Sequence, residues 1–169
     1  MKSSLILLIT ITVCVALSGC SLAQRMMPGS TMSNQEILGV LNAINRSEID
    51  AGQLAKQRGS TPEVRSFASR MLNEHQMMMQ NMNQWAQRMD MQPQKPALAS
   101  TLEKAHQETM EELRNKSGSD FDKAYMEYQV KMHKQSVSLV KDAADSVDNP
   151  NLKLQLRQAM PDLQNHLAS

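Results

Sequence analysis

Apolar residues recur every three to four positions through five stretches of the chain, and none of these stretches alternates strictly between apolar and polar residues. The first spacing is typical of an amphipathic helix, the second of a strand. Ser33 with Glu36 and Ser100 with Glu103 match the capping box, which marks a helix start. The pattern therefore predicts no strand and five helices, at about 33–58, 61–89, 100–116, 119–147 and 152–167.

The connection between the second and third predicted helices is short. Residues 91–97 contain Pro93 and Pro96 and therefore form a loop. Seven residues reach at most about 25 Å, whereas the second helix is roughly 40 Å long, so a direct up-and-down connection is expected. The predicted fold class is all-α, a bundle of four main helices with an additional C-terminal helix over residues 33–169.

The N-terminus has the pattern of a targeting segment. A short positive start is followed by an apolar run, residues 5–17, that is too short to span a bilayer. The run ends in Leu17-Ser18-Gly19-Cys20, which resembles the bacterial lipobox. This resemblance implies a signal peptide at 1–19, acyl chains on Cys20 and a tether at 20–32. Ser21, rather than an aspartate, is similar to the residue that sorts lipoproteins to the outer membrane, where the protein would face the periplasm.

Composition argues against some classes of function and against an internal disulfide. The chain has 169 residues with 18 Lys+Arg and 17 Asp+Glu, a formal charge of +1, and no long basic run. Nucleic-acid binding is therefore not expected, because it rests on clustered phosphate contacts. Cys14 would leave with the signal peptide and Cys20 would be acylated, so no disulfide can form within the mature chain. An ordinary secreted protein, with Cys20 as a spare thiol, is the alternative.

Several acids and histidines fall on the apolar faces of the predicted helices. A carboxylate or an imidazole that faces a core costs free energy unless it is paired, hydrogen-bonded or bound to a metal. One interpretation is that these side chains converge and hold a divalent ion, since imidazole and carboxylate suit Zn, Fe, Mn or Cu. The other is a buried polar network that fixes helix register. The candidate residues are Glu48, His75, Asp122, His133 and His166.

These positions also carry a resemblance to a known family. The chain is similar to bacterial envelope proteins with domain of unknown function 4142, which implies a ferritin-like four-helix bundle and an envelope location but no agreed biochemical activity. A ferritin-like oxidase would need two Glu-x-x-His pairs, and this chain has one, Glu103 with His106. The matching stretches are residues 48–55, Val64-x-x-Phe67-Ala68-x-x-Met71 with Glu74-His75, Phe121-Asp122-x-x-Tyr125-x-x-x-Gln129-Val130-x-x-His133, and Pro161-x-Leu163-x-x-His166-Leu167.

The chain contains 15 methionines, several of which follow His75. Thioethers select Cu(I) over harder ions, so Met78, Met79 and Met82 are candidate soft-metal ligands that share a helix face with His75. The simpler interpretation is that this stripe packs in the core. Met77 cannot share that face and is expected to point outward.

Two hypotheses of function follow. The first is an outer-membrane lipoprotein whose periplasmic bundle binds a metal ion in metal or stress handling. The second is a structural or partner-binding envelope lipoprotein in which the polar cluster only specifies the fold. The sequence contains no phosphate-binding glycine loop and no nucleophile elbow, which favours a protein that is not an enzyme. No protein partner can be named from the sequence, and the expected membrane contact is the lipid at Cys20.

Overall fold

The first two helices begin at the capping residues that the sequence predicts. In the computed structural model, which describes residues 32–169, Ser33 accepts a hydrogen bond from the backbone N–H of Glu36, whose carboxylate accepts one from Ser33. Thr61 caps the second helix, with Pro62 in its first turn. The described residues form no strand, and the all-α prediction is confirmed. The helices are α1 (Asn34–Arg58), α2 (Pro62–Arg88), α3 (Ala97–Arg114), α4 (Gly118–Ser146) and α5 (Pro150–Ala168).

The third helix begins earlier than predicted. The expected capping box at Ser100 is wrong, because the backbone N–H of Ser100 already donates to the carbonyl of Pro96 at 3.3 Å. Glu103 pairs with Lys95 instead of with Ser100. Proline fixes its own φ near the helical value, so Pro96 serves as the boundary residue and α3 gains its first turn at residues 97–100.

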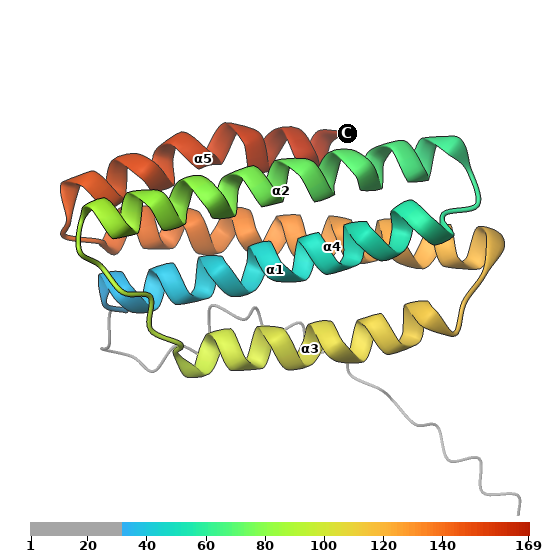
Figure 1. Cartoon of the computed structure of the whole chain (residues 1–169), viewed down its shortest axis with the longest axis horizontal. Helices are drawn as coiled ribbons and strands as arrows, with labels where there is room; N and C mark the ends of the chain where they lie inside the picture. Colours follow the sequence, from blue (N-terminus) through green and yellow to red (C-terminus); the bar gives the residue numbers. More distant parts are fainter. Residues whose placement is uncertain (1–31) are drawn as a thin grey trace, which may run out of the picture.

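Consecutive helices run in opposite directions (Figure 1). The segment between α2 and α3 crosses the end of α1, where the backbone N–H of Gln94 donates to the carbonyl of Gln35 at 2.9 Å. Gly39 permits this crossing, because a Cβ atom there would lie 1.8 Å from the carbonyl oxygen of Gln94. The short loop therefore makes the direct connection that its length predicts.

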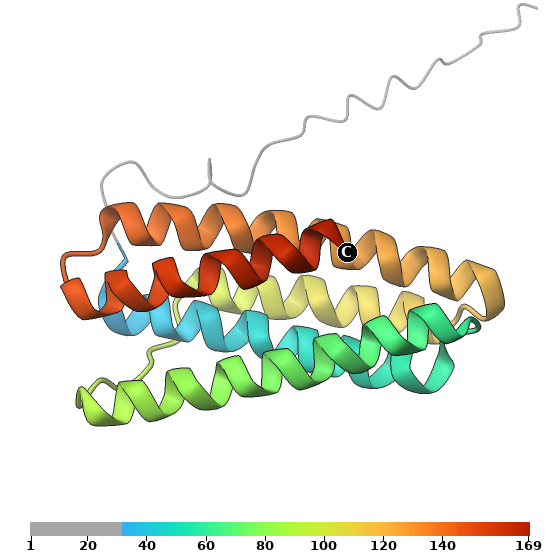
Figure 2. The ribbon, with the colours of Figure 1, turned by 90° about the horizontal axis from the view of Figure 1, so that it is seen from above.

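The core is apolar at both ends of the bundle and polar in the middle. In one half, α1, α2 and α4 enclose apolar side chains together with α5, including Leu38, Trp85 and Leu156. In the other half, α3 takes the place of α5 around Phe121 and Tyr125. Viewed from above, α5 lies between α2 and α4 and covers only the part of them nearest the α4–α5 turn (Figure 2). This arrangement is the predicted four-helix bundle with an additional C-terminal helix.

The predicted membrane attachment concerns the part of the chain before the bundle. Within residues 32–169, none of the helices combines the length and the apolar character needed to cross a bilayer. The predicted signal peptide (1–19), the lipidation site Cys20 and the tether up to residue 31 lie outside the residues that the structure describes.

Candidate metal centre

Three histidines from three helices meet in the polar middle of the bundle. His75 comes from α2, His133 from α4 and His166 from α5, and all three are buried. Each offers one ring nitrogen that lies within 4.8 Å of the nitrogens of the other two. The ring centroids are 5.2 to 5.6 Å apart. The fold thus brings together three of the five residues predicted as divalent-metal ligands.

The second nitrogen of each ring is held by an acceptor. Nδ1 of His75 lies 2.9 Å from Oδ1 of Asn45, whose own Nδ2 donates to the carbonyl of Leu41. Nδ1 of His133 lies 3.0 Å from the carbonyl of Gln129. Amide oxygens only accept hydrogen bonds, so both ring nitrogens must carry the proton. The remaining nitrogen of each ring, Nε2, therefore holds a lone pair.

His166 follows the same pattern with its two nitrogens exchanged. Its Nε2 carries the proton and donates a hydrogen bond to the carboxylate of Glu74, which can only accept. Its Nδ1 lies 3.2 Å from Nε2 of His133. Hydrogen bonds that fix the far nitrogen of an imidazole are the usual support of a histidine metal ligand. Here an amide, a peptide carbonyl and a carboxylate provide that support.

The inner nitrogens lack enough protons to satisfy one another. Nε2 of His75 is buried and has no hydrogen-bond partner. Two lone pairs 3.2 Å apart on His133 and His166 repel each other unless a proton or a cation lies near both. Metal–nitrogen bonds of about 2.0–2.1 Å in a tetrahedral site place the nitrogens roughly 3.3 Å apart. The His133–His166 pair already has this spacing, and His75, whose nitrogen lies within 4.8 Å of both, would have to move closer to complete a three-imidazole site.

Burial keeps two of the rings in the form that binds metals. Loss of solvation, together with the neighbouring His133 and His166, lowers the pKa of His75 to about 3. Loss of solvation and the neighbouring His166 likewise lower the pKa of His133 to about 4. The hydrogen bond to the carbonyl of Gln129 opposes this shift. Both imidazoles are therefore neutral at pH 7, as coordination to a metal requires.

Glu48 stands beside the centre but does not point into it. Its Oε2 accepts a hydrogen bond from Nε2 of Gln129 at 2.7 Å, and its Oε1 lies 3.9 Å from Nδ1 of His133. Nδ1 is the nitrogen of His133 that is not shared with the other histidines. Burial raises the pKa of Glu48 to about 7, although the Gln129 hydrogen bond opposes this shift. Glu48, which was predicted as a metal ligand, therefore lies next to the outer nitrogen of His133 and is not part of the three-histidine cluster.

Asp122 is remote from the histidines, so its predicted place in their cluster is wrong. Its carboxylate accepts hydrogen bonds from the backbone N–H and hydroxyl of Ser60 and from the backbone N–H of Thr61, at 2.6 to 3.1 Å. Asp122 precedes His133 by eleven residues, which is about 16 Å along a helix. Three helical turns preserve the face of a helix but not proximity, and Asp122 instead fastens the α1–α2 turn.

The fourth histidine of the chain belongs to a separate hydrogen-bonded group. Nδ1 of His106 lies 2.8 Å from the hydroxyl of Tyr128, and its Nε2 lies 3.0 Å from a carboxylate oxygen of Asp50. Its Glu-x-x-His partner, Glu103, pairs with Lys95. The residues that the sequence analysis missed are the supports Asn45, Glu74 and Gln129. In the motifs quoted above, Glu74 directly precedes His75 and Gln129 lies one turn before His133. These positions were the sequence signal that could have identified them.

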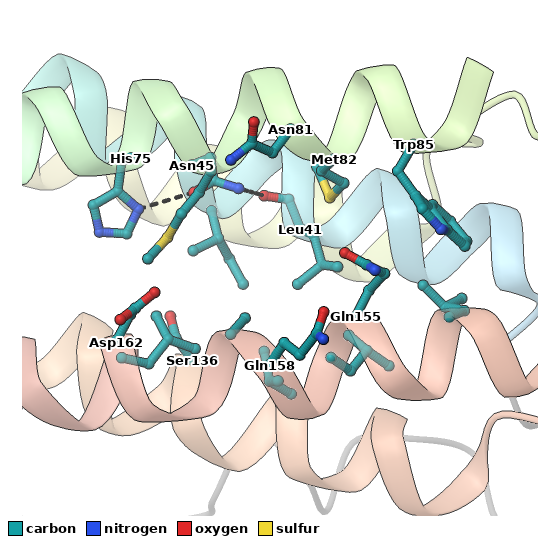
Figure 3. A pocket seen from close by; sticks show the side chains of 17 residues that line it. Leu41, Asn45, His75, Asn81, Met82, Trp85, Ser136, Gln155, Gln158 and Asp162 are labelled. Carbon is teal, nitrogen blue, oxygen red and sulfur yellow. Dashed lines mark hydrogen bonds between the residues drawn. The ribbon is translucent and has the colours of Figure 1, made fainter. Parts of the chain in front are cut away.

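The methionines after His75 separate into two sets. Met78 and Met82 line a cavity of about 280 Å³ that also reaches His75, Asn45 and residues of α4 and α5 (Figure 3). Met79 is not among the residues that line it. Met77 is 55% exposed, which confirms its outward orientation. Two of the three predicted soft-metal ligands therefore face a common space beside the centre.

The fold and the histidine cluster define an all-helical bundle protein with a buried imidazole centre. The family model for the domain of unknown function 4142 matches residues 21–169, so the chain belongs to this family. The bundle is similar to the structure of CopM in the Cu(II)-bound form, with a TM-score of 0.62 and 12% sequence identity. That alignment covers 82% of this chain and 93% of CopM. Among curated proteins, none matches the chain.

Proposed function

We propose that this protein is an outer-membrane lipoprotein, anchored through Cys20, whose periplasmic bundle binds one transition-metal ion through His75, His133 and His166. The observation that carries the proposal is the set of three ring nitrogens that converge with their far nitrogens all held by acceptors. The role of the protein would be metal or stress handling in the envelope.

Copper is the first ion to test. Imidazole ligands suit Zn, Cu, Ni and Fe, and the affinity of such a site for divalent ions rises to a maximum at Cu²⁺. The likeness to CopM, a structure with bound Cu(II), points the same way. Zinc is the second candidate, because three histidines with an open fourth position is a common zinc arrangement.

The test is a metal titration of the full chain, purified in a mild detergent and stripped of metal with a chelator. We expect one Cu(II) per chain and a rise in the melting temperature, since ligand at 100 times its Kd stabilises the folded state by about 2.7 kcal/mol. His133→Ala should abolish both effects. His106→Ala is the matched control, because its ring lies outside the centre, and it should keep the metal-dependent rise.

A purely structural cluster gives the opposite result. In that case a proton on Nδ1 of His166 satisfies Nε2 of His133, and no ion is needed. None of the four metals Cu, Zn, Fe and Mn would then bind stoichiometrically, and none would change the melting temperature. This outcome would refute the metal proposal and favour the structural or partner-binding lipoprotein.

The anchor is tested separately. Cys20→Ser should prevent acylation and release the protein from the membrane fraction, whereas the same substitution at Cys14, within the predicted signal peptide, should leave a labelled, membrane-bound mature chain. Incorporation of radioactive palmitate measures this directly. Labelling that survives Cys20→Ser would contradict the lipoprotein assignment.

A further inference from the structure

The cavity beside the histidine centre has donor groups that change in character from its rim to its floor. At the rim, Asn81, Gln155, Gln158 and Asp162 are exposed and supply amide and carboxylate oxygens. Met78 and Met82 are half-buried, and His75 is fully buried at the inner end. Figure 3 shows Asp162 and the two glutamines on α5, across the cavity from Asn81, Met82 and His75 on α2.

The spacing of Met78 and Met82 along α2 allows both sulfur atoms to bind one metal ion. Residues 78 and 82 are four positions apart, so their Cβ atoms lie about 5–6 Å from each other on one helix face. His75 precedes Met78 by three positions and lies on the same face. Because methionine has three rotatable bonds and a polarisable sulfur, two thioethers at this spacing can reach a single ion between them.

The donor set distinguishes among cations. Thioethers select soft ions such as Cu(I), whereas imidazole accepts both Cu(II) and Zn. Of the three histidines of the centre, only His75 also lines the cavity, and its Nε2 has no hydrogen-bond partner. The exposed carboxylate of Asp162 adds a negative charge at the rim, which favours a cation over an anion in this space.

We infer that the cavity is a second, softer metal position, in which Met78 and Met82 bind a monovalent soft cation such as Cu(I), next to the histidine centre. The inference rests on the proposed function, because the cavity would give copper a second position between solvent and the three histidines. Met77, which is exposed, and Met79, which does not line the cavity, take no part in it.

Ag(I) is a suitable probe because it is a soft monovalent ion that does not change its oxidation state under these conditions. The full chain, labelled with ¹³C at the methionine methyl groups, is titrated with Ag(I). The resonances of Met78 and Met82 should shift together, at one Ag(I) per site. Trp85, the single tryptophan of the chain, lines the same cavity and reports binding through its fluorescence.

Paired variants give the decisive comparison. Met78→Leu with Met82→Leu should weaken Ag(I) binding by at least about tenfold, the lower end of the loss seen when even an outer contact to a metal is removed. Met77→Leu with Met79→Leu is the matched control and should bind Ag(I) as the native chain does. Leucine replaces methionine in cores at little cost, so both pairs should fold, which the melting temperature verifies.

The results separate this inference from the proposed function. Unchanged Ag(I) affinity in the Met78/Met82 pair, or equal losses in both pairs, would overturn the soft position while leaving Zn(II) and Cu(II) binding at the histidines intact. Loss of Ag(I) affinity in that pair alone, with Zn(II) affinity unchanged, supports it. A native chain that binds neither Zn(II) nor Cu(II) would overturn the histidine centre and, with it, the role of the cavity as its neighbour.

Discussion

Replacing Glu48 by Gln removes the buried carboxyl group beside His133 and keeps its size. In the native chain the pKa of Glu48 is raised from 4.5 to about 7, chiefly by burial and against the hydrogen bond from Gln129. The folded state therefore holds this proton more tightly than the unfolded state. The resulting stabilisation is fully present below pH 4.5 and is lost as the pH rises to about 7.

The size of the effect follows from the shift. A displacement from 4.5 to about 7, at 1.36 kcal/mol per unit, corresponds to roughly 3 kcal/mol over the whole range. Most of it falls between pH 5 and pH 8. Glu48→Gln lacks this titration, so its free energy of unfolding relative to the native chain should increase by roughly 2–3 kcal/mol between these two pH values. The buried histidines titrate in both proteins and largely cancel in the difference.

Urea denaturation of the metal-free full chain, followed by Trp85 fluorescence, measures this difference at pH 5 and pH 8. Trp85 is buried in the core, so its emission reports unfolding. Glu111→Gln, which changes an exposed carboxyl on α3, is the control and should show no comparable change with pH. A Glu48→Gln difference that is the same at both pH values would refute the reasoning, because it would mean that the folded carboxyl ionises as readily as the unfolded one.

Three further outcomes are expected. Asn45→Ala should weaken Cu(II) binding about 10- to 100-fold by freeing the ring of His75, as isothermal titration calorimetry would show; an unchanged affinity would mean that the Asn45 contact does not orient the ligand. The metal-free Glu48→Gln chain, which lacks the opposing titration of Glu48, should lose stability as the pH falls from 6.5 toward 4 in urea titrations. Burial lowers the pKa of His75 and His133, so only the unfolded chain takes up these protons; a flat profile would contradict those shifts. Asp122→Ala should cost about 1–3 kcal/mol of stability by leaving donors of the α1–α2 turn unpaired yet keep native Cu(II) affinity, and loss of binding would return Asp122 to the centre.

Helical periodicity was sufficient to predict the bundle, because burial of one face per helix determines which residues point inward. It placed His75, His133 and His166 on inner faces correctly. It could not assign depth along the bundle axis, which depends on how neighbouring helices are staggered. Asp122 shows the consequence, since it shares a side of α4 with His133 but binds the α1–α2 turn.

The hydrogen-bond partners of the histidines could not be predicted from the sequence pattern, for a different reason. Asn45 and Glu74 reach their rings from residues 30 and 92 positions away in the sequence, and no local spacing encodes such pairs. Glu48 was predicted from its place on an apolar helix face, and that place does not say which nitrogen of His133 the carboxyl group would lie near. Periodicity therefore identifies the side chains that enter a core, whereas hydrogen-bond partners decide which of them present a lone pair.

Counting protons connects these observations to the chemistry of the centre. Asn45, Gln129 and Glu74 fix one proton on each ring, so the three inner nitrogens share three lone pairs and no proton. Without a metal, the simplest relief is one added proton between His133 and His166, which leaves Nε2 of His75 unpaired. A metal ion bound to the three nitrogens, as proposed above, would relieve all of them at once and would displace that proton. In that case metal binding at this centre would be linked to proton release by the same geometry.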